Sequence, residues 1–213
     1  MAEPVAIAVL AKAPVAGLAK SRLVPALGAE GAAKLQARLI ERTLSTACAA
    51  AVGPVTLWAA PDETHPLFAA MRRQFGAALA RQPDGDLGER MHAAIAAAGA
   101  PALVIGTDCP ALTADHLRAA AEALRERDAV MIPAEDGGYV LIGLQKPRPA
   151  LFSAMHWGTA TVMAETRRRL VSLGLSFREL APLWDVDTAA DLERLRREHP
   201  SLCRPRDSGD DTI

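Results

Sequence analysis

The chain has 213 residues, half of them hydrophobic, and a formal net charge of −1 at pH 7. This length is enough to bury a core without disulfides or a structural metal, and the near-neutral charge argues against binding to nucleic acid or to an anionic membrane. Three distant cysteines without a CxxC pair argue against a disulfide framework and a zinc cluster. We therefore expect a cytoplasmic protein without a membrane span.

Five short apolar runs have the length of buried strands: 5–10, 54–60, 101–106, 128–133 and 139–144. They alternate with longer stretches of helical period, which is typical of an α/β sheet covered on both faces. Only "AEDGG" separates the last two runs, so they form a hairpin rather than a parallel crossover. The sequence thus predicts a mixed, mostly parallel sheet.

The longest helical candidate runs from about 29 to 52, with Leu35, Leu39 and Leu44 near one face. Further helices are predicted near 65–75, 87–98, 114–126, 160–173 and 188–198. Thr113 and Thr188 are suitable N-caps. We expect one domain over residues 1–198, followed by a polar, flexible tail over 199–213.

The first candidate functional loop is "KAPVAGLAKSRL", which follows the first strand. Gly17 allows the backbone to approach a ligand, while Lys20 and Arg22 can donate to phosphate oxygens. It is neither a Walker A loop nor a GxGxxG motif. The alternative is an ordinary solvated basic turn before a helix.

The segment "GTDCPAL" places Asp108 just after a buried strand, at the edge where open α/β sheets bind their ligands. A carboxylate there can bind Mg²⁺ or Mn²⁺, since hard cations prefer oxygen ligands. Alternatively, Asp108 and Thr113 only cap the next helix.

Downstream, "WDVDTAADL" carries Asp185 and Asp187 on one side of an extended segment. Two carboxylates on one side repel each other unless a cation or hydrogen-bond donors lie between them. A metal role and a capping role are both compatible with this pattern.

In "AEDGGYVLIGL", Gly137 and Gly138 leave room for a substrate close to the backbone. Glu135 and Asp136 could accept hydrogen bonds from hydroxyls, or one of them could act as a base. An acidic pair followed by two glycines is also ordinary hairpin chemistry.

The loop "RQPDGDLGERM" offers Gln82, Asp86, Gly88 and Arg90 for reading a base edge or a ribose, although it is equally an ordinary turn and cap. Trp157 could stack on a ring or cover the core.

In this order, the motifs "KAPVAGLAKSRL", "QPDGDLGERM", "GTDCPAL", "PAEDGGYVLIGL" and "WDVDTAADL" resemble the DUF2064 family, over about residues 5–197. These are small proteins of the nucleotide-diphospho-sugar transferase superfamily with a glycosyltransferase-A type fold, a three-layer α/β sandwich. The first loop also resembles that of 2-phospholactate guanylyltransferases.

The resemblance implies that Gly17, Lys20 and Arg22 bind the phosphates of a nucleotide, and we expect Ala11 at the start of the loop to contact the nucleotide as well. The resemblance places the divalent metal on Asp108 and Asp187, with Asp185 as a nearby substitute.

We therefore expect an Mg²⁺- or Mn²⁺-dependent transferase that binds a nucleotide or nucleotide sugar and a small-molecule acceptor. Nucleotidyl transfer with release of pyrophosphate is favoured, because Lys20 and Arg22 suit a leaving pyrophosphate. In a glycosyltransferase, the sugar would lie near Glu135 and Asp136. A non-catalytic nucleotide-binding protein is a third hypothesis, and the sequence leaves open whether the chain forms a homodimer.

Overall fold

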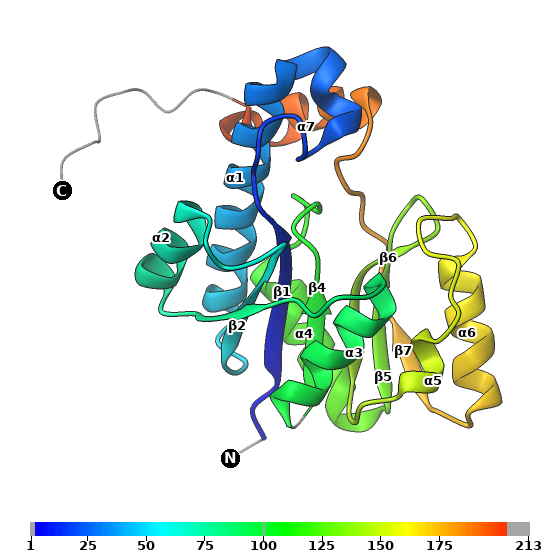
Figure 1. The fold of residues 1–213 in the computed structure, drawn as a ribbon. Coiled ribbons are helices and arrows are strands. Elements are labelled where there is room, and N and C mark those ends of the chain that lie inside the picture. The colour runs from blue at the N-terminus through cyan, green and yellow to red at the C-terminus, as the bar shows by residue number, and fades with distance from the viewer. Residues whose placement is uncertain (1–2, 100, 204–213) are drawn as a thin grey trace.

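A seven-stranded sheet runs through the computed structural model, which describes residues 3–99 and 101–203 (Figure 1). Its strand order is β3-β2-β1-β4-β6-β5-β7, and β6 is antiparallel to both of its neighbours whereas every other pairing is parallel. The strands are β1 (Ala6–Lys12), β2 (Val55–Ala60), β3 (Ala78–Arg81), β4 (Ala102–Ile105), β5 (Ala129–Pro133), β6 (Tyr139–Leu144) and β7 (Phe177–Glu179). The mixed, mostly parallel α/β sheet is as predicted.

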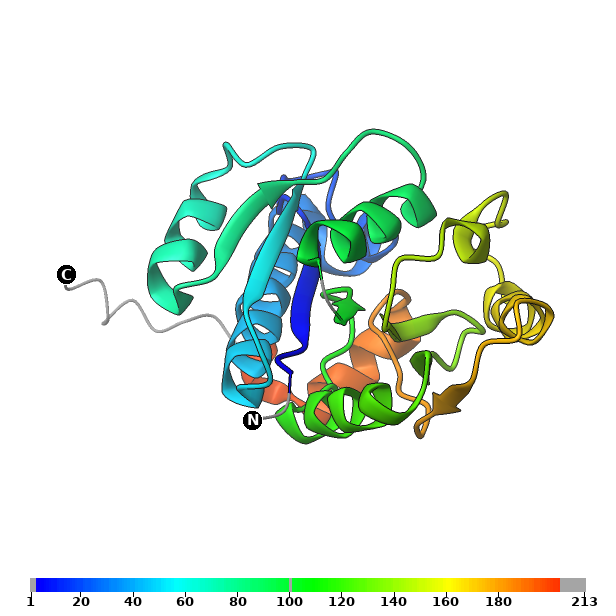
Figure 2. The same ribbon diagram turned by 90° about the horizontal axis from the view of Figure 1, so that it is seen from below.

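Helices cover both faces of this sheet (Figure 2). One face carries α1 (Val24–Ala50), α2 (Pro66–Phe75) and α4 (Ala114–Glu126), and the other carries α3 (Leu87–Ala98), α5 (Pro149–Phe152) and α6 (Val162–Ser172). The last helix, α7 (Ala189–Glu198), lies beside the start of α1 (Figure 1). Within the described residues, no helix combines the length and the apolar character needed to cross a membrane.

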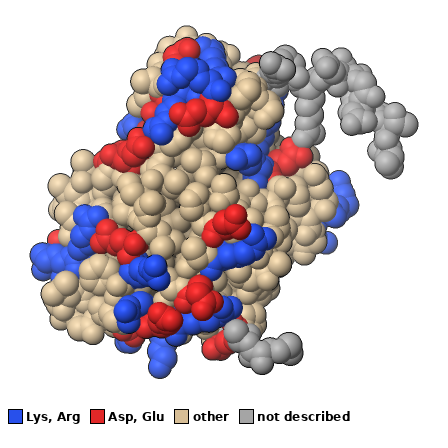
Figure 3. Space-filling model, turned by 180° about the vertical axis from the view of Figure 1, so that it is seen from behind, with Lys and Arg blue, Asp and Glu red and all other residues tan. Residues whose placement is uncertain are grey.

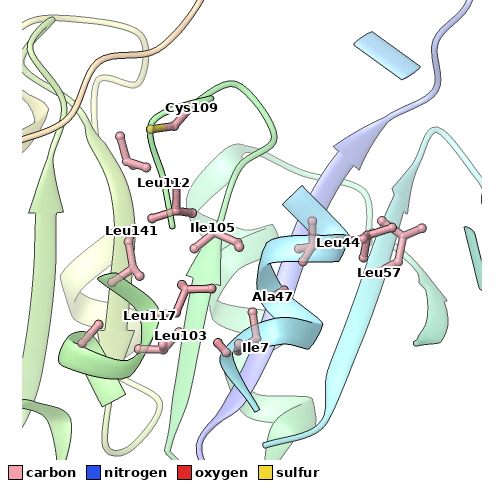
Figure 4. Close-up of a cluster of buried hydrophobic side chains, with 14 of the residues drawn as sticks. Ile7, Leu44, Ala47, Leu57, Leu103, Ile105, Cys109, Leu112, Leu117 and Leu141 are labelled. Atoms are coloured by element: carbon pink, nitrogen blue, oxygen red, sulfur yellow. The ribbon is translucent and has the colours of Figure 1, made fainter. Parts of the chain in front are cut away.

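The larger core lies between the sheet and the face formed by α1, α2 and α4. Figure 4 shows Leu44 and Ala47 of α1 among strand side chains, and Leu117 of α4 beside Leu103 and Leu141. These residues are almost completely buried because both faces of the central strands are covered, so the strands are continuously apolar rather than alternating.

A smaller cluster of buried hydrophobic side chains lies near the carboxyl edge of the sheet. Leu23 and Leu39 pack there with Trp184 and Val186, and with Leu192 of α7. The cluster therefore ties the first loop, α1 and the segment that carries Asp185 and Asp187 into one body.

The predicted strands and longer helices are all present, and the predicted hairpin joins β5 to β6. Helix α1 begins earlier than predicted, at Val24, with a non-helical Gly28 inside it. The sequence missed β3 and β7, which are only four and three residues long and lack fully buried positions.

The start of the predicted flexible tail has regular structure. Residues Pro200–Leu202 form a 3-10 helix, and Leu202 packs into the small cluster while its carbonyl accepts a hydrogen bond from Arg38. The rest of that prediction, residues 204–213, lies outside the described residues.

On the face shown in Figure 3, lysine and arginine lie among aspartate and glutamate, and no single sign dominates. This mixture agrees with the small net charge of the whole sequence.

Candidate active site

A cavity of about 910 Å³ opens at the carboxyl edge of the parallel strands. The chain leaves β1 toward β2 on one side and β4 lies on the other, so this is the place where the strand order reverses and α/β sheets bind ligands. Seven of the residues singled out in the sequence line it: Ala11, Lys20, Arg22, Gln82, Arg90, Asp108 and Asp187. Four separate motifs thus meet in one cavity.

Lys20 lies at the centre of the polar contacts. Its Nζ is 2.7 Å from Asp108 Oδ1 and donates to the carbonyl of Val186 at 2.5 Å. Only 5% of the Lys20 side chain is exposed, against 50% for Asp108. The backbone of Lys20 is left-handed, with φ of 48°, a conformation that costs a non-glycine residue free energy and that clusters at functional sites.

A second ion pair joins Arg22 to Asp187. The Arg22 side chain is 72% exposed, so this pair adds little stability. The segment that holds Asp187 is fixed instead by its backbone, because Val186 N donates to the Asp108 carbonyl at 2.8 Å. The backbones of the two aspartate motifs are therefore held side by side, and a shared metal on Asp108 and Asp187 stays a prediction.

Asp185 is a third acidic group in this region. Burial, followed by the nearby charges of Asp136 and Asp108, raises its pKa from 3.8 to about 6. Mutual repulsion of this kind is what a divalent cation relieves, and carboxylate oxygens are ligands that Mg²⁺ and Mn²⁺ prefer. The donor set fits such a cation, although no three His, Cys, Asp or Glu side chains of the described residues are arranged to hold one together.

Two buried glutamines form part of the cavity wall. Gln82 donates from Nε2 to the carbonyls of Ala11 at 3.2 Å and Trp58 at 2.8 Å. Gln36 of α1, which sequence reasoning missed, donates to Thr107 Oγ1 at 3.1 Å. Gln36 could have been found from the sequence, because it is a polar residue on the side of the predicted helix that carries Leu35 and Leu39.

Two other residues predicted to bind the nucleotide have structural roles at the start of α3 that need no ligand. Asp86 caps the helix by accepting from Glu89 N at 2.9 Å, and Glu89 reciprocates by accepting from Asp86 N. A Cβ on Gly88 would lie 2.7 Å from Trp157 Cζ2, so glycine is needed for packing there. Neither Asp86 nor Gly88 lines the cavity.

The turn between β5 and β6 also has local partners. Glu135 forms an ion pair with Arg194 of α7 at 2.9 Å, and Asp136 Oδ1 accepts from Gly138 N at 2.9 Å. Gly137 has φ of 93°, and a Cβ on it would collide with the backbone of Ala160. None of these turn residues lines the cavity, so substrate binding by them stays a prediction.

Trp157 covers the core rather than lining the cavity. Its ring is 6.4 Å from Tyr139 and 6.5 Å from Phe152. Tyr139 itself lines the cavity and was not singled out in the sequence. Gly17 lies in the exposed part of the first loop with φ of 80° and open space around it, so the backbone there is accessible.

The family model described as "Uncharacterized protein conserved in bacteria (DUF2064)" matches residues 43–159. A phosphoenolpyruvate guanylyltransferase of Sphaerobacter thermophilus is 30% identical over 199 residues, which are 90% of this chain and 93% of the relative.

A solved structure from Desulfovibrio desulfuricans G20, provisionally described as a nucleotide-diphospho-sugar transferase, is 29% identical with a TM-score of 0.83 and covers 94% of this chain and 90% of its own. A Methanothermobacter nucleotidyl transferase shares the fold at 17% identity, with a TM-score of 0.68 and coverage of 92% and 97%. The chain belongs to the DUF2064 family and is a transferase with the nucleotide-diphospho-sugar transferase fold.

Proposed function

We propose that the protein is a divalent-metal-dependent nucleotidyltransferase that transfers a nucleotidyl group from a nucleoside triphosphate to a small phosphorylated acceptor. The observation that carries the proposal is the alternation of charge at the sheet edge, where Lys20 faces Asp108 and Arg22 faces Asp187 in one cavity. Cations for phosphates and carboxylates for a metal are the two halves of a nucleotide–metal site.

Asp108 and Asp187 would hold the metal, with Asp185 next to them. A bound Mg²⁺ or Mn²⁺ would neutralise charge on the phosphates. Lys20 and Arg22 would then exchange their carboxylate partners for phosphate oxygens. Because the Lys20 side chain is mostly buried, its ammonium is poorly hydrated, and its attraction to those oxygens would be stronger than that of a fully exposed lysine.

In the reaction, an oxygen of the acceptor forms a bond to the α-phosphorus, and the bond from that phosphorus to the bridging oxygen of the β-phosphate breaks. Pyrophosphate leaves with the electron pair. The side chains of the protein contribute position and charge rather than a covalent intermediate. Lys20 and Arg22 would stabilise the growing negative charge on the leaving pyrophosphate.

Gln82 supports recognition of the base. Both hydrogens of its amide are donated to backbone carbonyls, so its oxygen remains as a fixed acceptor. Guanine offers N–H donors on its Watson–Crick edge and pairs well with such an acceptor. The guanylyltransferase name of the Sphaerobacter relative points to GTP, and to phosphoenolpyruvate as the first acceptor to test.

Glycosyl transfer is the second candidate, favoured by the description of the Desulfovibrio structure. In that reaction the sugar would approach the turn of Glu135 and Asp136. Substituting Lys20 separates the candidates, since it should disable nucleotidyl transfer and cost less in glycosyl transfer.

The proposal is tested by thermal unfolding of the protein with nucleoside triphosphates and nucleotide sugars, each with and without Mn²⁺. A ligand at about 100 times its Kd stabilises a fold by roughly 2.7 kcal/mol. We expect GTP with metal to give the largest rise in Tm and Asp108→Ala to abolish it. A larger rise with a nucleotide sugar would favour glycosyl transfer, and no rise with any ligand would contradict both.

A further inference from the structure

Cationic side chains surround the cavity, and most of them already have an acceptor within the protein. Lys12 Nζ donates to the Leu18 carbonyl at 2.9 Å, Lys20 pairs with Asp108, and Arg22 pairs with Asp187. Arg81 donates to the Pro61 carbonyl at 3.2 Å and pairs with Asp84 at 3.1 Å.

Arg90 is different. Its side chain lines the same cavity, yet it has no hydrogen bond or ion pair with any described residue, and its Nε is buried without a partner. A guanidinium carries five N–H donors, and burying a donor without an acceptor costs free energy. The cavity wall at Arg90 therefore lacks an acceptor that a bound anion would supply.

Arg90 is not needed to hold the helix on which it lies. The start of α3 is fixed by the reciprocal contacts of Asp86 with Glu89, by the packing of Gly88 against Trp157, and by Met91, which is buried in the core. No contact of the Arg90 side chain with the described residues therefore requires a cation at this position.

Arg90 and the first loop approach the cavity from opposite faces of the sheet. Lys20 and Arg22 reach the cavity from the loop before α1, and α1 packs on one face of the sheet. Arg90 reaches it from α3, which packs on the opposite face (Figure 2). An anionic group held by Arg90 would thus contact the opposite side of the cavity from the one formed by the first loop.

We propose that Arg90 binds an oxyanion of a substrate, a phosphate or a carboxylate group, as a second anion site facing the Lys20 side of the cavity. The proposal rests on the proposed function in taking this cavity as the site of the reaction. The planar guanidinium suits two-point binding of either group. The oxyanion could come from the triphosphate or from the acceptor, and the test below distinguishes them.

The test compares Arg90→Met with Arg73→Met, because methionine keeps an apolar stem and Arg73 is an exposed arginine of α2 that does not line the cavity. Binding of GTP with Mn²⁺, of phosphoenolpyruvate and of inorganic pyrophosphate is measured separately by calorimetry on the full chain. Thermal unfolding without these ligands is measured alongside.

We expect Arg90→Met to unfold at the same temperature as the wild type or higher, and to bind at least one of the three probes tenfold more weakly. Arg73→Met should bind all three as the wild type does, and Arg90→Lys should recover part of the loss. A loss for GTP and pyrophosphate places the nucleotide's phosphates at Arg90, whereas a loss for phosphoenolpyruvate alone places the acceptor there.

Unchanged binding of all three probes by Arg90→Met would overturn the inference. If GTP binding still depended on Asp108 in that case, the proposed function would stand without it. If the wild type bound none of the probes, both would fall.

Discussion

The ion pair between Lys20 and Asp108 joins a buried ammonium to a carboxylate that is half exposed. This asymmetry predicts unequal costs for removing the two partners. Asp108→Asn leaves the ammonium with the Val186 carbonyl and the nearby charge of Asp185 but without its ion-pair partner, and a buried charge that loses its partner is costly. Lys20→Met leaves a carboxylate that water can reach.

We therefore expect Asp108→Asn to lower the free energy of unfolding by about 1–3 kcal/mol, and Lys20→Met to lower it by less. Urea unfolding of both variants without added metal measures the difference. An equal or larger loss of stability for Lys20→Met would show that the unequal burial of the two partners does not determine the cost of removing each one.

Asp185 predicts a pH dependence of stability. Its pKa is raised to about 6 in the folded protein, mainly by burial, so between about pH 4 and 6 the folded state binds its proton more tightly than the unfolded state does. The contribution of Asp185 to stability is therefore greatest below its ordinary pKa and is lost as pH rises toward 6.

Asp185→Asn removes this titration. At pH 7 in a chelator, the variant should be more stable than the wild type by up to about 3 kcal/mol, and at pH 3.5 the two should be nearly equal. Unfolding curves of both proteins at a series of pH values provide the check. A wild type that is more stable than the variant at pH 7 would contradict the assignment.

At the scale of elements, the packing of α3 against the loop that carries Trp157 depends on a glycine in its first turn. Alanine is normally favoured over glycine in a helix by about 1 kcal/mol. At Gly88, however, a Cβ would lie 2.7 Å from Trp157 Cζ2 and 3.0 Å from the Phe152 carbonyl oxygen, and overpacking costs about 1–3 kcal/mol.

We expect Gly88→Ala to lower Tm because the clash outweighs the helix propensity. Gly31→Ala in α1 is the matched control, since its Cβ would meet only the Leu27 Cβ, at 3.1 Å, and Tm should change little or rise. Thermal unfolding of the two variants decides this, and a stabilised Gly88→Ala would refute the close packing.

The sequence predicted helices and strands best where the hydrophobic periodicity and the capping residues at the ends agreed. Thr113 and Thr188 form the expected N-caps, each with a reciprocal partner three residues later. Short elements such as β3 and β7 were missed because three or four residues carry too little pattern, and their strand form depends on pairing with β2 and β5.

For the candidate site, the sequence could predict which loops gather at the sheet edge, because parallel strands place their carboxyl ends together. It could not predict partners across the fold. Glu135 pairs with Arg194, 59 positions away, and Gly137 is adjacent to Ala160, so residues that looked available to a substrate contact the protein itself.

At the scale of the whole molecule, the fold brings a basic loop, two acidic segments and the start of α3 to one cavity from both faces of the sheet. No single motif specifies the reaction, because a fold does not by itself determine the chemistry of its site. The choice between them depends on which bond breaks in the nucleotide.

The most direct test is to identify the phosphorus-containing products by ³¹P NMR after incubating the protein with GTP, phosphoenolpyruvate and Mn²⁺, with Asp108→Ala as the control. We expect pyrophosphate in equal amount to a new guanylylated acceptor with the wild type, and neither product with the variant. Absence of pyrophosphate, together with release of a nucleoside diphosphate from a nucleotide sugar in a parallel sample, would contradict this expectation.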